Sequence, residues 1–185
     1  FLVAELTEYS GITEIDNSDN TLSKRVVSTA ALASRVLSLS SINLANRHAS
    51  GKLDNAFAIT NLQDVAAGRA AQRSRYTDDG LRGPGGLTEL DARMLNGLYF
   101  LGLDYRFNVS EVAGGVHSNN SLHYKGLAFD VTHINGVRVS STHPNLAAFH
   151  LRAKALGASK VLNEGNHLHI SWRDDPEVAS TTSTK

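Results

Sequence analysis

The stretch SLHYKGLAFD, residues 121–130, joins a loop to the start of a strand. From residue 127 onward the side chains alternate as they do in a strand, which places Phe129 on one face and Asp130 on the other. Gly126 allows either a positive φ or a close backbone approach where the loop enters the strand. His123 on that loop can therefore fold back over Asp130, so that an imidazole and a carboxylate meet above the sheet.

A second stretch, EGNHLHISW, begins at Glu164 and alternates in the same way. His167 and His169 share one strand face and lie about 7 Å apart, from the rise per residue of a strand. A catalytic zinc site has three protein ligands and an open position. His123, Asp130 and one of the two later histidines satisfy this count. The remaining histidine, or Glu164, is then free to act as a general base.

The spacing S-x-H-x-x-G-x-A-x-D followed by H-x-H resembles the zinc peptidases of the D-Ala-D-Ala carboxypeptidase and murein endopeptidase group. The hedgehog signalling domain and lysostaphin-type enzymes share this metal-site design, and the resemblance covers roughly the C-terminal half of the chain. It implies a Zn²⁺ ion held by His123, Asp130 and His169, with Glu164 or His167 as the catalytic base. Some members place a Glu three residues before the ligand His. Glu164 has that spacing to His167 and not to His169.

One feature of these relatives is missing from the sequence. Many of them carry an Arg on the strand before the first motif, where it can stabilise the oxyanion, but residues 107–117 contain no Arg. Either His117 substitutes for it or an Arg comes from elsewhere in the chain. The candidates are Arg69, Arg73, Arg75 and Arg82. We expect His117 and Ser121, which opens the first motif, to contact the substrate.

The resemblance implies metal-assisted hydrolysis of an amide bond in peptidoglycan stem peptides or cross-links, by a carboxypeptidase or an endopeptidase. It also implies a secreted, periplasmic or cell-wall-associated hydrolase of bacterial or phage origin. Two alternatives remain open. One is a non-catalytic, hedgehog-like binding or signalling module that keeps its zinc for structure. The other is a metal-free domain that binds carbohydrate or protein.

Composition sets limits on these expectations. The chain has 185 residues, 41% of them hydrophobic, which suits one globular domain with a core. Lys plus Arg and Asp plus Glu both number 18, so the basic excess typical of nucleic-acid-binding proteins is absent. No apolar run is long enough to predict a transmembrane helix. The sequence has no Cys, which excludes Cys-ligated zinc.

We predict an α+β fold in which N-terminal helices are followed by a small, mainly antiparallel sheet that carries the metal site. An arm over residues 1–20 precedes a single domain over 21–173, and a flexible tail covers 174–185. The domain divides into a helical part over 21–87 and a catalytic core over 88–173.

Local signals place the individual elements. In the helical part, one helix is expected from Thr21 or Ser23 to about residue 47 and another over 58–75, followed by a glycine-rich loop over 77–86. In the core, we expect a helix from a capping box at Thr88 and Asp91 to about Leu101, and a second helix that starts at Pro144, ends before Gly157 and buries Leu151. The expected strands cover residues 105–112, 160–162 and 167–172. A further strand starts at residue 127 and leads into a hairpin turn at Asn135-Gly136.

Overall fold

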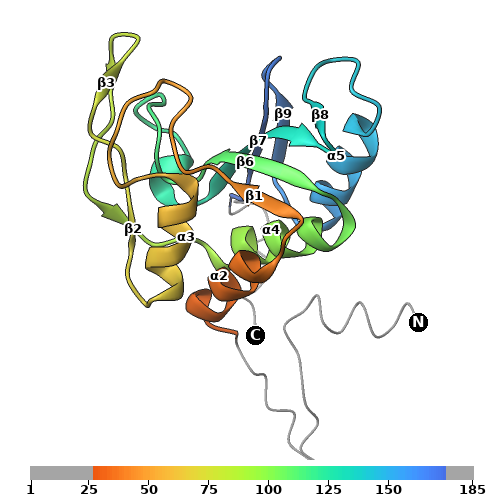
Figure 1. Cartoon of the computed structure of the whole chain (residues 1–185), viewed down its shortest axis with the longest axis horizontal. Coiled ribbons are helices and arrows are strands. Elements are labelled where there is room, and N and C mark those ends of the chain that lie inside the picture. Colours follow the sequence, from red (N-terminus) through yellow and green to blue (C-terminus); the bar gives the residue numbers. More distant parts are fainter. Residues whose placement is uncertain (1–26, 174–185) are drawn as a thin grey trace, which may run out of the picture.

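The computed structural model describes residues 27–173. The expected arm over residues 1–20 and the tail over 174–185 lie outside this range, so both stay predictions. Within it, four α-helices and a mixed six-stranded sheet form an α+β fold, joined by two small two-stranded sheets (Figure 1). The predicted fold class is confirmed at this level.

The central sheet carries both sequence motifs. Its strand order is β1-β6-β7-β10-β9, and β8 pairs with β7. The strands are β1 (Ile42–Leu44), β6 (Phe107–Glu111), β7 (Ala128–Ile134), β8 (Val137–Arg138), β9 (Lys160–Asn163) and β10 (Leu168–Ser171). β1 runs parallel to β6, and the other pairings are antiparallel. The sheet is therefore mainly antiparallel, as expected, with a parallel strand added at one edge.

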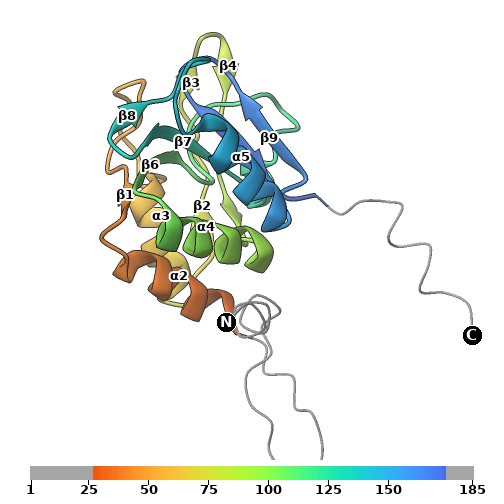
Figure 2. The same ribbon diagram turned by 90° about the vertical axis from the view of Figure 1, so that its right-hand side faces the viewer.

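Four helices pack around this sheet, and α2 and α4 lie side by side in both views (Figures 1 and 2). The helices are α2 (Thr29–Ser38), α3 (Ala58–Ala66), α4 (Ala92–Asp104) and α5 (Leu146–Ala155). One buried cluster includes Leu32 of α2, Leu62 of α3, Leu98 of α4, Phe149 of α5 and Ile170 of β10. The N-terminal helices thus share a hydrophobic core with the strands that carry the motifs.

The start predicted for the first helix, at Thr21 or Ser23, lies outside the described residues, and within them the helix is shorter than predicted. α2 begins after Ser28, whose hydroxyl accepts a hydrogen bond from the backbone N–H of Ala31, and it ends before Leu39. The residues that follow form β1, in which Ile42 and Leu44 are buried and the residue between them is exposed. This alternation is that of a strand, and the predicted helix to residue 47 is wrong because it extends across β1.

The second helix is also shorter than predicted. α3 ends at Ala66, two residues before Gly68, which has a positive φ of 75°. The chain that was expected to be helical up to residue 75 is instead extended and pairs with part of the predicted loop. Two small sheets result, one from β2 (Ala71–Gln72) with β5 (Leu87–Thr88) and one from β3 (Thr77–Asp78) with β4 (Leu81–Arg82). The β3–β4 hairpin projects from the body of the molecule (Figure 1).

The later elements follow the prediction closely, with two differences. Asp91, not Thr88, caps α4, because its Oδ1 accepts hydrogen bonds from the backbone N–H groups of Arg93 and Met94. On α5, Leu151 is 70% exposed instead of buried. The hairpin turn between β7 and β8 is confirmed, since Asn135 and the glycine after it both have positive φ.

Candidate metal centre

The centre is built where the first motif enters the sheet. Asp130 on β7 lies directly opposite His169 on β10, and His123 begins the short 3-10 helix η1 (His123–Lys125) that precedes β7. Gly126 ends that helix with a φ of 68°, and a Cβ added to it would lie 1.9 Å from the backbone oxygen of Glu89. Both properties expected of Gly126 are therefore present, and they fix how His123 approaches the strand.

Three potential ligand atoms form a nearly equilateral triangle. Nε2 of His123, Oδ1 of Asp130 and Nδ1 of His169 are each 3.1 Å from the other two. Tetrahedral zinc with bonds of about 2.0–2.1 Å to nitrogen and oxygen separates its ligand atoms by roughly 3.3 Å. The triangle therefore has the size that one such ion requires, and a small outward shift of each side chain would admit it.

The ring of His123 is held with the correct nitrogen toward this triangle. Its Nδ1 donates a hydrogen bond to the carbonyl oxygen of Val112 at 2.6 Å, so in the neutral ring the lone pair is on Nε2, on the side of Asp130. Metal-binding histidines usually donate their second ring N–H to a carbonyl or carboxylate in this way. His123 is 1% exposed, which leaves its ring little freedom to turn.

The charges of the triangle depend strongly on one another. Burial alone would raise the pKa of Asp130, but His123, together with a hydrogen bond from His169, holds it well below its usual range. Burial favours the neutral form of His123, yet the carboxylate of Asp130 raises the pKa of this ring above its usual value. The site therefore keeps an ionised carboxylate and attracts positive charge, which a proton or a metal ion can supply.

His117 offers a different third ligand. Ligand atoms of His117, His123 and Asp130 all lie within 4.8 Å of one another, so this group too can hold a metal ion. However, the ring of His117 is stacked on that of His123, with centroids 4.0 Å apart and planes 5° apart. An imidazole binds a metal in its own ring plane, so His117 would have to turn out of its stacked position before it could bind the same ion as His123. The triangle with His169 has the better geometry.

His117 has partners of its own next to the triangle. Its Nε2 donates to the carbonyl oxygen of Gly114 at 3.0 Å, and its backbone N–H donates to the hydroxyl of Tyr124. Burial, helped by the neighbouring His123, lowers the pKa of His117 to about 4. His117 is therefore a neutral ring lying over His123 at neutral pH.

The second motif brings Glu164 and His167 to the same place. Nε2 of His167 lies 3.2 Å from Oε2 of Glu164 and 3.7 Å from Oδ2 of Asp130. His167 thus reaches the carboxylate oxygen that faces away from the triangle, whereas His169 reaches the oxygen within it. Both side chains are more accessible than the triangle, with exposed fractions of 44% for Glu164 and 25% for His167.

Two hollows meet at the metal centre, and both are lined by Val116, His117, Asp130 and His167. The larger, of about 540 Å³, also includes His123, His169, Ser121, Glu164, Lys160 and Arg173. The smaller, of about 250 Å³, also includes Glu111, Tyr76, Asp78 and Arg138. Ser121 lines the larger hollow, and its Oγ accepts a hydrogen bond from the backbone N–H of His123.

The four arginines proposed for the oxyanion are not in these hollows. Arg69 pairs with Asp64 on the surface, and Arg82 is exposed on β4. Arg73 and Arg75 line a separate hollow. Among the described residues, the cations at the metal centre are instead Arg138, Lys160 and Arg173. All three lie on or next to strands that flank the two motifs. This position in the sequence could have identified them as cations of the centre.

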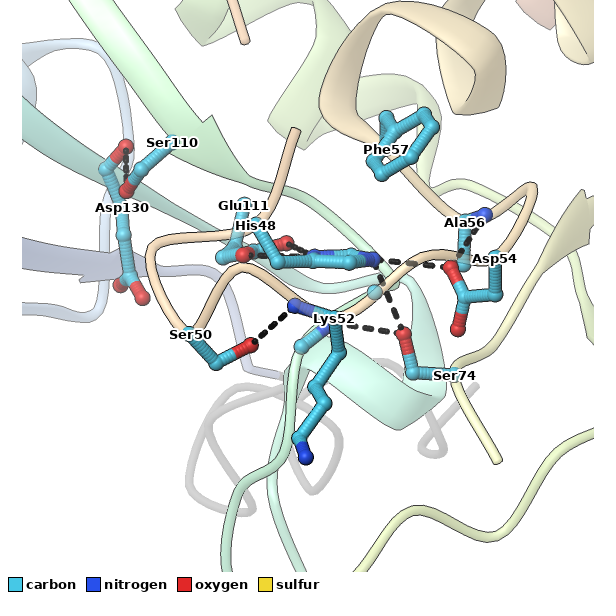
Figure 3. A network of polar contacts seen from close by, with 12 residues as sticks. His48, Ser50, Lys52, Asp54, Ala56, Phe57, Ser74, Ser110, Glu111 and Asp130 are labelled. Carbon is cyan, nitrogen blue, oxygen red and sulfur yellow. Dashed lines mark hydrogen bonds and ion pairs between the residues drawn. The ribbon is translucent and has the colours of Figure 1, made fainter. Parts of the chain in front are cut away.

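A buried charged network beside the centre has no signal in the sequence. Figure 3 shows the ring of His48 between the carboxylates of Glu111 and Asp54, with Ser74 near one nitrogen. Nδ1 of His48 lies 2.8 Å from Oε1 of Glu111, and Nε2 lies 2.8 Å from Oδ1 of Asp54. Burial opposes a charge on His48, but the two carboxylates outweigh it and raise its pKa. Glu111 is the neighbour of Asp130 across β6 and β7.

No family model, curated protein or solved structure matches this chain. Among residues 27–173, no helix has the length and apolar character needed to cross a membrane. The interpretation of the centre therefore depends on its own geometry and on the motif resemblance.

Proposed function

We propose that the protein is a zinc-dependent peptidase that hydrolyses amide bonds in peptidoglycan stem peptides or cross-links. The observation that carries this proposal is the triangle of 3.1 Å distances between His123, Asp130 and His169. Three ligands leave an open position on the ion, which is the arrangement of catalytic rather than structural zinc sites. A bound Zn²⁺ ion supplies Lewis acidity toward water and toward a scissile carbonyl.

In this proposal, Glu164 and His167 transfer the proton. Both line the larger hollow, and their 3.2 Å separation allows them to exchange a proton. Glu164 is the more exposed of the two, so it can meet water entering from the hollow and accept its proton. The same proton can then pass to the leaving amine. His167 positions Glu164 and can carry the proton in its place.

The other residues of the centre bind the substrate. Lys160 and Arg173 line the larger hollow, and Arg138 lines the smaller one. These cations can hold the carboxylates of a stem peptide on either side of the scissile bond. His117 is neutral and its Nε2 already donates to a carbonyl, so its role is to support His123 and to bound the hollow. A secreted, periplasmic or cell-wall location follows from this substrate.

The experiment is digestion of purified muropeptides, both monomeric and cross-linked, by the zinc-loaded protein, with the products identified by mass spectrometry. Loss of a single terminal residue from monomers defines a carboxypeptidase, and conversion of dimers to monomers defines an endopeptidase. A protein that binds zinc but cleaves neither substrate is better described as a non-catalytic zinc module. A protein that binds no zinc contradicts the proposal altogether.

A further inference from the structure

A third hollow lies away from the metal centre. It has a volume of about 600 Å³ and is lined by residues 53–55, 72–73, 75–76 and 86–87. None of the metal-centre residues lines it, but Tyr76 lines both this hollow and the smaller hollow at the centre. A ligand that occupies it therefore lies next to the cleft that reaches Asp130.

Two unpaired guanidinium groups give this hollow its chemistry. Neither Arg73 nor Arg75 has an ion-pair partner among residues 27–173. Nε of Arg73 is buried without a hydrogen-bond partner in this part of the chain, and its Nη1 makes only a long contact of 3.5 Å with the carbonyl oxygen of Tyr124. A buried donor of a charged group that lacks a partner is costly, so it indicates a missing acceptor.

The glycine-rich segment after β4 holds these arginines in place. Its backbone pairs with that of residues 73–76, through hydrogen bonds from Arg73 to Gly86 and from Gly83 to Tyr76. A Cβ on Gly86 would lie 2.9 Å from Nη2 of Arg73, and a Cβ on Gly83 would lie 2.2 Å from a backbone oxygen. The absence of a side chain at Gly86 thus leaves space for the guanidinium group of Arg73, and its absence at Gly83 allows the close approach of the Ser74 backbone.

The remaining lining suits a peptide. Asn55 and Gln72 are exposed amides, while Leu53 and Leu87 are 83% and 60% exposed apolar side chains. The carboxylate in the lining, Asp54, is hydrogen-bonded to His48 and is outnumbered by the two arginines. The hollow therefore combines net positive charge with amide and apolar contacts.

We propose that this hollow is a second binding site, which takes a carboxylate-bearing part of a peptide through Arg73 and Arg75. Guanidinium groups bind carboxylates through paired, charge-assisted hydrogen bonds. The identity of the peptide as part of the substrate rests on the proposed function, since stem peptides carry free carboxylates. The site would hold a portion of the substrate remote from the scissile bond.

The test measures binding, not turnover. The full chain carrying Glu164→Gln is titrated by calorimetry with a muropeptide bearing free carboxylates and with its fully amidated form. Arg75→Ala is expected to weaken binding of the acidic form at least about tenfold. Amidation should have a smaller effect in this variant than in the parent protein, because only the carboxylates held by Lys160, Arg173 and Arg138 at the metal centre are then lost. Arg82→Ala removes an exposed arginine nearby that does not line the hollow, so it serves as the matched control and should change affinity less than about twofold.

Further variants separate the possible outcomes. Arg73→Lys keeps the charge but loses the paired geometry, so it should weaken binding by an intermediate factor. Equal affinities for Arg75→Ala and Arg82→Ala, or no effect of amidation on the parent protein, would overturn the second site. Tighter binding of inorganic phosphate than of the acidic muropeptide would overturn a carboxylate as its ligand. Failure of the unmodified protein to hydrolyse muropeptides, with this binding pattern intact, would contradict only the proposed function.

Discussion

Asp130 and His169 face each other across β7 and β10, with Oδ1 of one 3.1 Å from Nδ1 of the other. This cross-strand pair joins the two motifs, which lie 39 residues apart in the chain. Because both residues are on neighbouring strands, their separation is set by the sheet and not by a loop. His123 then needs only a short turn to complete the triangle.

The turn that places His123 should depend on Gly126. Alanine at this position must adopt a φ of 68° and also meets the backbone oxygen of Glu89 at 1.9 Å. Gly136→Ala is the matched control, because Gly136 has a φ of 81° but open space around it. We expect the free energy of unfolding of both variants to fall by about 1–2 kcal/mol, because alanine must adopt a left-handed backbone conformation. In Gly126→Ala the free energy of unfolding, measured with urea, should fall by about 1–3 kcal/mol more, because the added Cβ crowds the backbone of Glu89. Equal losses would show that Glu89 moves away freely.

Zinc affinity should fall as the pH is lowered. His123 must be deprotonated at Nε2 to bind a metal, and its pKa lies above the usual value for histidine. Protons therefore compete with zinc more strongly here than at an ordinary histidine, and below this pKa each unit of pH should weaken binding about tenfold per displaced proton. Calorimetric titrations between pH 8 and pH 5.5 measure this slope. An affinity independent of pH would exclude His123 as a ligand.

The buried His48 network should stabilise the fold in a pH-dependent way. His48→Gln leaves the carboxylate of Glu111 without its cation, which should cost about 3 kcal/mol near pH 6. The folded pKa of His48 is raised above its unfolded value, so this contribution is complete below the unfolded pKa and is lost as pH rises through the folded one. The stability difference between the unmodified protein and His48→Gln should therefore shrink toward pH 9. His150→Gln, on α5, is the control for the same chemical change outside this network.

Catalysis should depend on Glu164 without loss of the metal. Glu164→Gln removes the carboxylate that accepts the proton but leaves the three ligand atoms in place, so zinc content should be unchanged. Hydrolysis of a muropeptide should fall at least about 100-fold, the contribution typical of a general base. If Glu164→Gln retains full activity and His167→Ala loses it, the histidine is the proton carrier.

The metal triangle could be predicted from the sequence because its determinants are local. The alternation around Asp130 and His169 fixes which strand face each side chain occupies, and Gly126 marks the turn before β7. The triangle distances favour His169 over His167, a choice that the three-residue spacing of Glu164 left open. The helix and strand order of the C-terminal half followed from similarly strong signals.

The N-terminal part was harder to predict for physical reasons. β1 has only three residues, and its apolar side chains also fit the period of the preceding helix. The helix predicted beyond Gly68 placed Arg73 and Arg75 on a helical surface, whereas both lie in an extended segment held by the glycine-rich loop. His48 and Glu111 are 63 residues apart, and nothing in the local sequence of either one indicates the other.

The measurement that tests the account most directly is the zinc content of the purified protein and of two variants after dialysis against buffered zinc. We expect about one ion per chain in the unmodified protein and in His167→Ala, and none in His169→Ala, with all three proteins folded by circular dichroism. His167→Ala keeps the triangle of His123, Asp130 and His169, whereas His169→Ala removes one of its corners. Full zinc content in His169→Ala, or its loss in His167→Ala, would contradict the assigned ligand set.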